Sequence, residues 1–396
     1  MKMAILGVWM WPVSVRVHGA EKVVRQCKKI GVTDIYFLTK GLTGETSFQC
    51  SLSPNSQRNY LSELIAAAHP MGIRVHAWFT SASDEHYKEL HPESGRFHYS
   101  RGRDKGLISL WDEGYLSYME KVTKELCRGY EIDGLHLDYI RYNHVLYGWS
   151  DMDAARYQKE GAHLHDLYRM IWRAFYKEGE KEENCLFDAY RAGDESVLAM
   201  ARVRRNDVRN FAERITSCAR AEKSGLILSA ALMPEGAYED TAFADVHYGQ
   251  NYEDAAQLYD YALPMAYSRA YEKDGAWVKM VAEGTLKRGL ATVMGLHAYE
   301  GGTGLTLKED QEALRDLPIK GICLFREGAT AFACPDGKKV SIYNALPDPI
   351  TCVKAGETEV KTEIASGEEK DIEFPFIPES LQVFSGEKEC SVYLAR

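Results

Sequence analysis

The sequence predicts a (β/α)8 barrel, the TIM-barrel fold, followed by a small all-β, sandwich-like domain. Over about the first 330 residues, short apolar runs alternate with longer amphipathic stretches, as in repeated β/α units with a parallel sheet. Beyond that point only short strand-like runs between Gly and Pro turns remain. A chain of 396 residues that is 45% hydrophobic can hold both parts. We expect the barrel over residues 1–332 and the β domain over 333–396.

Eight strands are expected in the barrel, and helix-period stretches lie between them, as at 20–30, 60–69, 113–129 and 207–221. Gly31, Gly72 and Gly225 stand where helices end before the next strand. The expected strands are Ile5–Trp9, Asp34–Thr39, Arg74–Phe79, Gly134–Tyr139, Ile227–Met233, Tyr261–Tyr267, Ala291–Ala298 and Gly321–Phe325. An open doubly wound sheet is the alternative, but it needs a Gly-rich phosphate loop that the sequence after the first strand lacks.

Two long insertions follow the third and fourth strands, at Ser81–Leu110 and Asn143–Val203. Such loops lie on the C-terminal face of a barrel, where substrates bind. The second should contain one helix, because apolar residues from Tyr157 to Phe175 recur at spacings of three, four and seven. It either contributes to the site or forms a lid that shields the barrel.

The C-terminal region reads as short strands, and the eighth barrel helix is weak or replaced there. The expected strands are Val340–Tyr343, Ile350–Val353, Glu359–Ile364, Ile372–Phe374 and Val392–Leu394.

Composition excludes several classes of function. A net charge of −10 without a basic stripe argues against nucleic acid, and the lack of an apolar run of about 18 residues argues against a membrane span. Nine scattered cysteines without C-x-x-C pairs argue against a disulfide framework or a structural zinc site. The many aromatic residues, among them 24 Tyr, suit carbohydrate partners but equally suit a core. No cofactor is expected, and the oligomeric state stays open.

The beginning of the chain, Met1–Pro12, resembles a signal peptide but is better explained as the first core strand. We expect a cytoplasmic protein if the chain is full length. If a signal peptide has been removed, a secreted or periplasmic location follows.

The segment Ile132–Tyr142 carries the strongest indication of function. In its strand, Gly134, His136 and Asp138 share one face, and Leu135, Leu137 and Tyr139 share the other. Polar groups on the inner side of a buried strand cost several kcal/mol each unless they are paired or solvated. Asp138 is therefore expected at the mouth of the barrel, where barrel enzymes hold catalytic groups. The alternative is a structural pair with Arg141.

Glu235 is the expected second carboxylate. Ser229, Ala231, Met233 and Glu235 would share a face of the fifth strand, next to the strand of Asp138. Adjacent strands lie about 4.8 Å apart, within the range of glycosidase carboxylate pairs. The alternative is a glutamate that begins a solvated loop after Pro234.

Further residues are candidates for substrate binding. His76 would hydrogen-bond substrate or orient Asp138, or else be a core histidine bonded to backbone. The other candidates are Trp9, Lys40, Trp78, His136, Arg141, Tyr267, His297, Glu300 and Glu327, the last two also as weaker second carboxylates. No Gly-x-Ser-x-Gly elbow occurs. Neither His-x-His on the first strand nor His-Glu-x-x-His occurs, so no metal site is expected.

Several segments together resemble the family-10-like bacterial glycoside hydrolases, TIM-barrel proteins related to glycan-cleaving enzymes. They cover most of residues 4–327 in the expected order, and the ordered set is fairly specific, although no single match is. The segments are Gly7–Trp9, Val75–Trp78, His91–Glu93, Tyr130–Tyr139, Arg204–Val208 and Pro264–Tyr267. The resemblance implies a glycosidase barrel with Asp138 as a catalytic carboxylate.

The chain also departs from these families. Many relatives carry a second acid where Tyr139 stands and Pro where Asn143 stands, and they often lack an acid at the position of Glu235. The same strand is similar to the D-G-x-D-x-D-x-E signature of chitinases, but Ile140 stands where their acid belongs. Substrate-assisted chitinase chemistry is therefore not expected.

The sequence thus favours a hydrolase that cleaves O-glycosidic bonds in a polysaccharide or oligosaccharide, a role in carbohydrate metabolism. Asp138 would act as nucleophile or base and Glu235 as acid. A catalytically silent barrel that binds glycans is the second hypothesis. A metal-dependent amidohydrolase is the third, and its ligand motif is missing.

Overall fold

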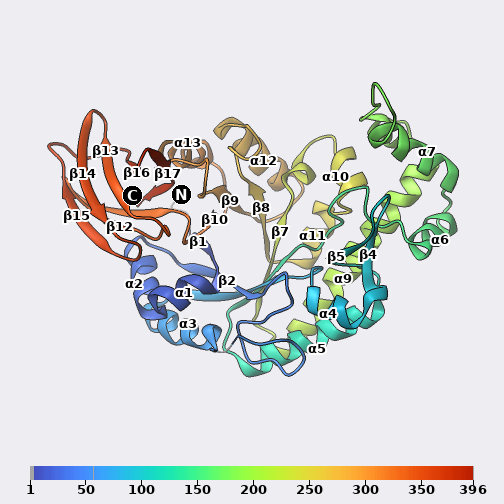
Figure 1. Cartoon of the computed structure of the whole chain (residues 1–396), viewed down its shortest axis with the longest axis horizontal. Helices are drawn as coiled ribbons and strands as arrows, with labels where there is room; N and C mark the ends of the chain where they lie inside the picture. Colours follow the sequence, from blue (N-terminus) through green and yellow to red (C-terminus); the bar gives the residue numbers. More distant parts are fainter. Residues whose placement is uncertain (1–3, 57, 396) are drawn as a thin grey trace.

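The computed structural model describes residues 4–56 and 58–395 and has a closed barrel of eight parallel strands at its centre (Figure 1). Residues 1–3 of the expected N-terminal segment lie outside the described residues. The strands follow the order β1-β10-β9-β8-β7-β6-β3-β2 around the barrel. Their bounds are β1 Ile5–Met10, β2 Asp34–Lys40, β3 Arg74–Thr80, β6 Gly134–Asp138, β7 Ile227–Leu232, β8 Tyr261–Ala266, β9 Val293–His297 and β10 Gly321–Phe325. The predicted TIM barrel is confirmed, with every strand within two residues of its expected ends.

Helices surround the barrel because the outward strand residues are apolar and pack against apolar helix faces in one large core. Asp112, Asp194 and Asp274 cap three of these helices by accepting hydrogen bonds from backbone N–H groups in the first turn. The expected helix over 207–221 is the second half of the 28-residue α9. The surrounding helices are α1 Pro12–His18, α2 Ala20–Lys29, α3 Tyr60–Ala68, α5 Glu113–Gly129, α9 Glu195–Glu222, α11 Tyr252–Leu258, α12 Gly275–Lys287 and α13 Gly304–Leu314. The short helix α10, Ala242–His247, packs instead with residues of the second insertion. Among the described residues, no helix is long and apolar enough to cross a membrane.

The two insertions have structure of their own. The first forms α4 (Glu85–Leu90) and a hairpin of β4 (Gly95–His98) and β5 (Gly102–Ile108). The second forms three helices that pack on the first half of α9 around a separate small core, at one end of the molecule (Figure 1). They are α6 Asp151–Lys159, α7 Leu164–Phe175 and α8 Cys185–Arg191. The expectation of one helix from Tyr157 to Phe175 is wrong, because Gly161 adopts a φ of 113° that ends α6.

The C-terminal region forms a module of two four-stranded sheets with its own core, at the other end of the molecule (Figure 1). The sheets have the orders β15-β12-β11-β18 and β14-β13-β16-β17. Five of the strands were expected, and β11, β16 and β17 were not. The bounds are β11 Ala331–Asp336, β12 Lys339–Tyr343, β13 Ile350–Ala355, β14 Thr358–Ile364, β15 Glu369–Glu373, β16 Gln382–Ser385, β17 Lys388–Cys390 and β18 Val392–Leu394.

The first of these sheets takes the place of the eighth barrel helix. Within residues 4–56 and 58–395, no helix follows β10. Phe332, Tyr343 and Tyr393 from the sheet belong to the barrel core, and Glu369 of β15 accepts hydrogen bonds from Gln26 and Lys29 of α2. The sheet thus seals the side of the barrel at which a helix would otherwise lie.

Candidate active site

Asp138 is the last residue of β6, and its carboxylate accepts hydrogen bonds from three N–H donors. Oδ1 accepts from the backbone N of Tyr139 at 2.7 Å and from Nη1 of Arg141 at 3.4 Å. Oδ2 accepts from Nε1 of Trp78 at 3.2 Å. Because every partner is a donor, this geometry favours the ionised carboxylate.

The carboxyl of Asp138 opens into a cavity of about 220 Å³ at the C-terminal end of the barrel strands. The cavity brings together five of the residues expected from the sequence, namely Trp9, Trp78, Asp138, Arg141 and Tyr267. The lining residues that sequence reasoning missed are Trp11, Leu38, Leu42, Thr80, Tyr139, Ala231, Met265 and Phe325. No residue of Asn143–Val203 lines it, so that insertion does not contribute to this cavity.

Phe325 and Tyr139 were missed as cavity-lining residues for different reasons. Phe325 ends the eighth strand, as Asp138 ends the fourth, so the rule that found Asp138 could also have found it. Tyr139 was expected on the outer face of its strand. The strand ends before it, and a φ of 59° turns its side chain into the cavity lining, where Arg141 stacks over its ring at 4.7 Å.

Burial and charge act in opposite directions on Asp138. Burial raises the pKa of this carboxyl, while the charge of Arg141 and the hydrogen bonds from Tyr139 and Trp78 lower it. Burial also raises the pKa of the Tyr267 hydroxyl well above its usual value, and the nearby charge of Asp138 adds to this effect. Tyr267 is therefore a neutral phenol beside the carboxylate and can donate a hydrogen bond to a bound oxygen.

His136 lies below the cavity and holds Trp9. Its Nε2 accepts from Nε1 of Trp9 at 3.2 Å, and its Nδ1 lies 2.9 Å from Oγ of Ser229. The indole N–H only donates, so Nε2 is unprotonated and Nδ1 carries the hydrogen. Burial, aided by His76, lowers the pKa of His136 well below its usual value, which agrees with a neutral ring. His136 therefore positions a cavity wall and does not line the cavity itself.

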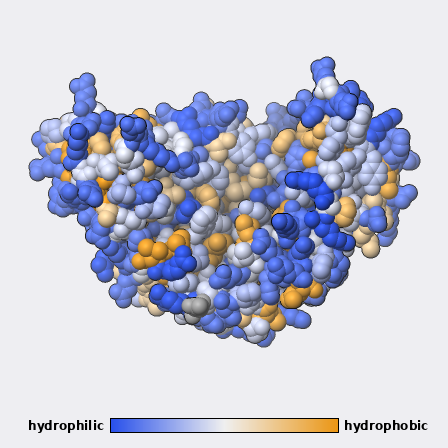
Figure 2. Space-filling model, in the orientation of Figure 1, coloured by the Kyte–Doolittle hydropathy of each residue, from blue (hydrophilic) through white to orange (hydrophobic). Residues whose placement is uncertain are grey.

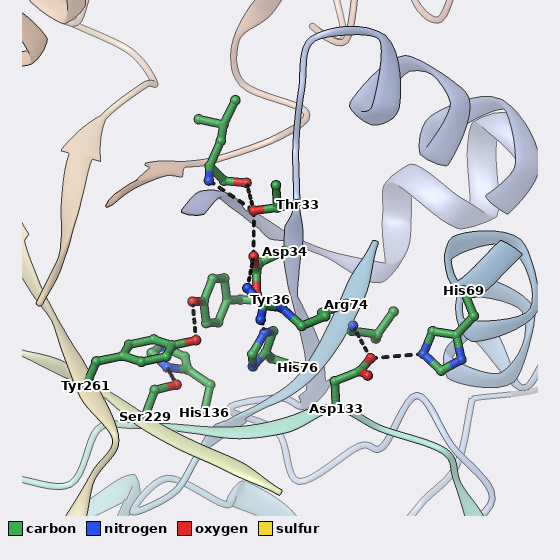
Figure 3. Close-up of polar contacts among 12 residues, drawn as sticks. Thr33, Asp34, Tyr36, His69, Arg74, His76, Asp133, His136, Ser229 and Tyr261 are labelled. Atoms are coloured by element: carbon green, nitrogen blue, oxygen red, sulfur yellow. Dashed lines mark hydrogen bonds and ion pairs between the residues drawn. The ribbon is translucent and has the colours of Figure 1, made fainter. Parts of the chain in front are cut away.

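His76 does not line the cavity and lies beside Asp34 and Tyr36 (Figure 3). Its Nε2 is 2.7 Å from Oδ1 of Asp34, its ring stacks on Tyr36 at 4.6 Å, and its Nδ1 has no partner among the described residues. Burial would raise the pKa of Asp34, but hydrogen bonds from His76 and Arg74 bring it to about 2. His76 is thus part of a buried ionic network at the N-terminal ends of β2 and β3.

Glu235 does not line the cavity. The fifth strand ends at Leu232, and a 3-10 turn over Pro234–Ala237 ends the expected alternation before Glu235 is reached. Its Oε1 accepts hydrogen bonds from the hydroxyls of Tyr271 at 3.2 Å and Tyr248 at 3.4 Å, and its Oε2 is buried without a partner among the described residues.

Burial and hydrogen bonding also act in opposite directions on Glu235. Burial raises its pKa, and the two tyrosines oppose this. The charge of Arg141 also lowers the pKa of Glu235, as it does that of Asp138. The Arg141 guanidinium thus interacts with both carboxyls.

Two further candidates are held in structural contacts. Nζ of Lys40 forms a buried ion pair with Asp84 at 2.8 Å and donates to the backbone O of Ser83. His297 stacks on Tyr299, with ring centroids 3.8 Å apart, and its Nε2 bonds the backbone O of Glu300. Neither Lys40 nor His297 lines the cavity.

Glu327 is buried on the far side of β1, away from the cavity. Its backbone N donates to the carbonyl of Trp9, and its Oε2 accepts from the hydroxyl of Ser14. Its Oε1 has no partner among the described residues, and burial raises its pKa to about 7. Glu327 is therefore a core carboxyl. Its position just after the eighth strand made it a candidate in the sequence, because strand position does not separate core carboxyls from catalytic ones.

A second cavity of about 460 Å³ lies between the barrel and the C-terminal module. Glu300 is in its lining, exposed and paired with Lys388 of β17 at 2.6 Å. Within the described part of the chain, no group of three or more His, Cys, Asp or Glu side chains could hold a metal ion.

Comparison with solved structures identifies the class of fold. The PgaB (BpsB) glycoside hydrolase domain from Bordetella bronchiseptica is 13% identical with a TM-score of 0.63, over 82% of this chain and 94% of that one. The catalytic domain of β-amylase from Paenibacillus polymyxa gives 11% identity and a TM-score of 0.58, over 81% and 92%. A β-galactosidase from Marinomonas ef1 is 13% identical with a TM-score of 0.59, over 82% of this chain and 54% of that one.

These similarities show a TIM barrel of the kind that glycoside hydrolases use. Because the sequence identities are low, they establish the fold alone. No family model and no curated protein matches the sequence.

Proposed function

We propose that the protein hydrolyses O-glycosidic bonds of a polysaccharide or oligosaccharide at the Asp138 cavity. The observation that carries the proposal is a carboxyl held by three N–H donors at a barrel strand end inside an aromatic cavity. Trp9, Trp78 and Tyr267 offer ring faces and a neutral hydroxyl, which suit the apolar faces and hydroxyls of a sugar.

The two carboxyls have surroundings that suit different roles. Asp138 accepts only from N–H donors and is suited to act as nucleophile or base. Glu235 has an unpartnered buried oxygen, which suits a proton-bearing acid. Because Glu235 stands outside the cavity lining, its participation requires the turn at Pro234–Ala237 to move toward the substrate.

One observation favours the second candidate function, a silent glycan-binding barrel. Among the described residues, Asp138 is the only carboxylate in the cavity lining, while glycosidases of the ordinary type use two. Such a barrel would bind saccharides through the same aromatic walls without cleaving them.

Asp138→Asn tests the proposal on a panel of aryl glycosides and gluco-, galacto- and chito-oligosaccharides. Loss of at least about a hundredfold in kcat/KM with retained binding would support a catalytic carboxylate. Asp310→Asn is the matched control, because Asp310 is equally buried but bonds Ser268 outside the cavity. Activity that survives Asp138→Asn would refute the assignment, and binding without turnover by the unmodified protein would favour the silent barrel.

A further inference from the structure

The second cavity adjoins the Asp138 cavity. Trp11 and Phe325 line both of them, so the two volumes lie on either side of these rings. The second is about twice as large, at about 460 Å³ against about 220 Å³. Figure 2 shows the face of the molecule hollowed between its two raised ends, with less hydrophilic residues in the hollow. A ligand held at Asp138 could therefore extend past Trp11 into the second cavity.

The barrel and the C-terminal module build the walls of this second cavity together. The barrel contributes the loop after β9, with Tyr299, and the residues after β10, with Arg326. The module contributes Ser385 at the end of β16 and the segment 346–348 between β12 and β13. The cavity thus depends on both the barrel and the C-terminal module.

The lining combines aromatic rings with unused hydrogen-bond donors. Arg326 stacks over Trp11 with its guanidinium carbon 3.6 Å from the ring centroid. Within the described part of the chain, the guanidinium donates one hydrogen bond, to the backbone O of Glu327 at 3.4 Å. Among the described residues it forms no ion pair, although burial lowers its pKa. A guanidinium has five N–H donors, so most of those of Arg326 remain open to a ligand.

The other charged groups of the lining are three acidic residues and one lysine. Glu300 and Lys388 pair with one another, Glu389 accepts from Gln382, and Asp348 adds one acceptor. Ring faces beside separate donors and acceptors suit a chain of sugar residues, whose rings have apolar faces and hydroxyl edges.

We propose that the second cavity binds further sugar residues of the saccharide chain whose scissile bond lies at Asp138. The C-terminal module is then part of the substrate-binding cleft, and the substrate is an oligosaccharide or polymer longer than the Asp138 cavity holds. This inference rests on the proposed function, since it takes the saccharide at Asp138 as given.

The test measures affinity against chain length. Cello-, galacto- and chito-oligosaccharides of two to six residues are titrated by calorimetry into the Asp138→Asn protein. Ser385→Trp, made in that background, fills the module side of the cavity. Thr358→Trp is the matched control, because Thr358 begins β14, an edge strand of the same sheet, and lines neither cavity. Thermal unfolding verifies that each variant is folded.

We expect the affinity to rise by about tenfold or more from two to six sugar residues. The rise should vanish in Ser385→Trp and should be retained in Thr358→Trp. Arg326→Gln breaks no ion pair among the described residues. It should reduce the rise in affinity with chain length without weakening disaccharide binding. Saccharide binding that is independent of chain length, or equally length-dependent in Ser385→Trp, overturns this inference and leaves the proposed function intact. Absence of saccharide binding to any variant and to the unmodified protein overturns both.

Discussion

The indole of Trp78 donates a hydrogen bond from Nε1 to Oδ2 of Asp138 at 3.2 Å. The two residues lie on neighbouring strands, β3 and β6, in which Thr80 pairs with Asp138 and Trp78 with His136. Trp78 therefore reaches the carboxylate from the side of the barrel interior. One residue thus supplies a cavity wall and fixes the orientation of the carboxylate.

Trp78→Phe should preserve the ring in the wall and remove the hydrogen bond to Asp138. A hydrogen bond to a charged group is worth about 1.5–3 kcal/mol, so we expect kcat to fall roughly tenfold or more on the best substrate. Trp277→Phe is the control, because it also removes an indole hydrogen bond, to the hydroxyl of Tyr238 at 2.9 Å, outside both cavities. Equal effects of the two substitutions would count against a role of Trp78 at the site.

His136 should stay neutral, with its hydrogen on Nδ1, at pH values near 6.5, at which an ordinary histidine is half protonated. Burial lowers its pKa well below the usual value, and Nε2 accepts from Trp9. Nitrogen NMR of the imidazole checks both points, and His136→Gln identifies its signals. A ring that becomes protonated above pH 6 would contradict the prediction.

The same depressed pKa makes His136 a source of acid sensitivity. In the unfolded chain this histidine binds a proton below about pH 6.5, whereas in the folded protein it does not, so the free energy of unfolding falls as the pH drops below that value. The fall should be smaller in His136→Gln, as measured by urea unfolding at pH 5 and pH 7.

Gly134→Ala should destabilise the protein by about 2 kcal/mol or more. A Cβ at this position would lie 2.1 Å from Nδ1 of His76, and His76 is held by its contact with Asp34. Gly129→Ala is the control, because Gly129 ends α5 with nothing within 4 Å of an added Cβ. It should leave stability unchanged or raise it by up to about 1 kcal/mol. Urea unfolding of both variants at pH 7 gives the comparison.

Glu327→Gln should flatten the dependence of stability on pH. Burial raises the pKa of Glu327 from 4.5 to about 7, so the folded protein keeps a proton that the unfolded chain loses between these values. Its contribution to stability is present below pH 4.5 and is lost by about pH 7, a change of about 3 kcal/mol. The unmodified protein should therefore lose about 3 kcal/mol more than Glu327→Gln between pH 4.5 and pH 8.

Chemical unfolding at several pH values measures the two slopes. Glu21→Gln, at an exposed position on α2, controls for the loss of one acidic side chain. Equal slopes for Glu327→Gln and the unmodified protein would show that Glu327 does not retain its proton.

The barrel strands were predictable because their signals are local. Apolar runs, strand alternation and helix-ending glycines are all properties of neighbouring residues. They located the ends of the eight barrel strands within two residues. The same alternation placed His136 on the inner face of β6, where it contacts Trp9 and Ser229. It failed at Tyr139 and Glu235, because each stands just beyond the end of its strand, where the backbone turns.

The partners of the candidate residues were not predictable, because they come from distant parts of the chain. Glu327 bonds Ser14, which is 313 residues away, and His136 contacts Trp9 across 127 residues. Lys40, Glu327 and Asp138 all stand at or just after strand ends, and only Asp138 opens into the cavity. Strand position alone does not distinguish a carboxyl that faces a cavity from one that is packed behind a helix.

The sequence by itself determined the barrel and the place of Asp138 at the end of its fourth strand, since periodicity and strand alternation act over a few residues. The tertiary structure alone decided which side chains surround Asp138. It also separated Glu235 from the cavity lining and placed the C-terminal module beside the barrel mouth. These relationships depend on barrel closure and strand register, which bring residues hundreds of positions apart into contact and which no local pattern specifies.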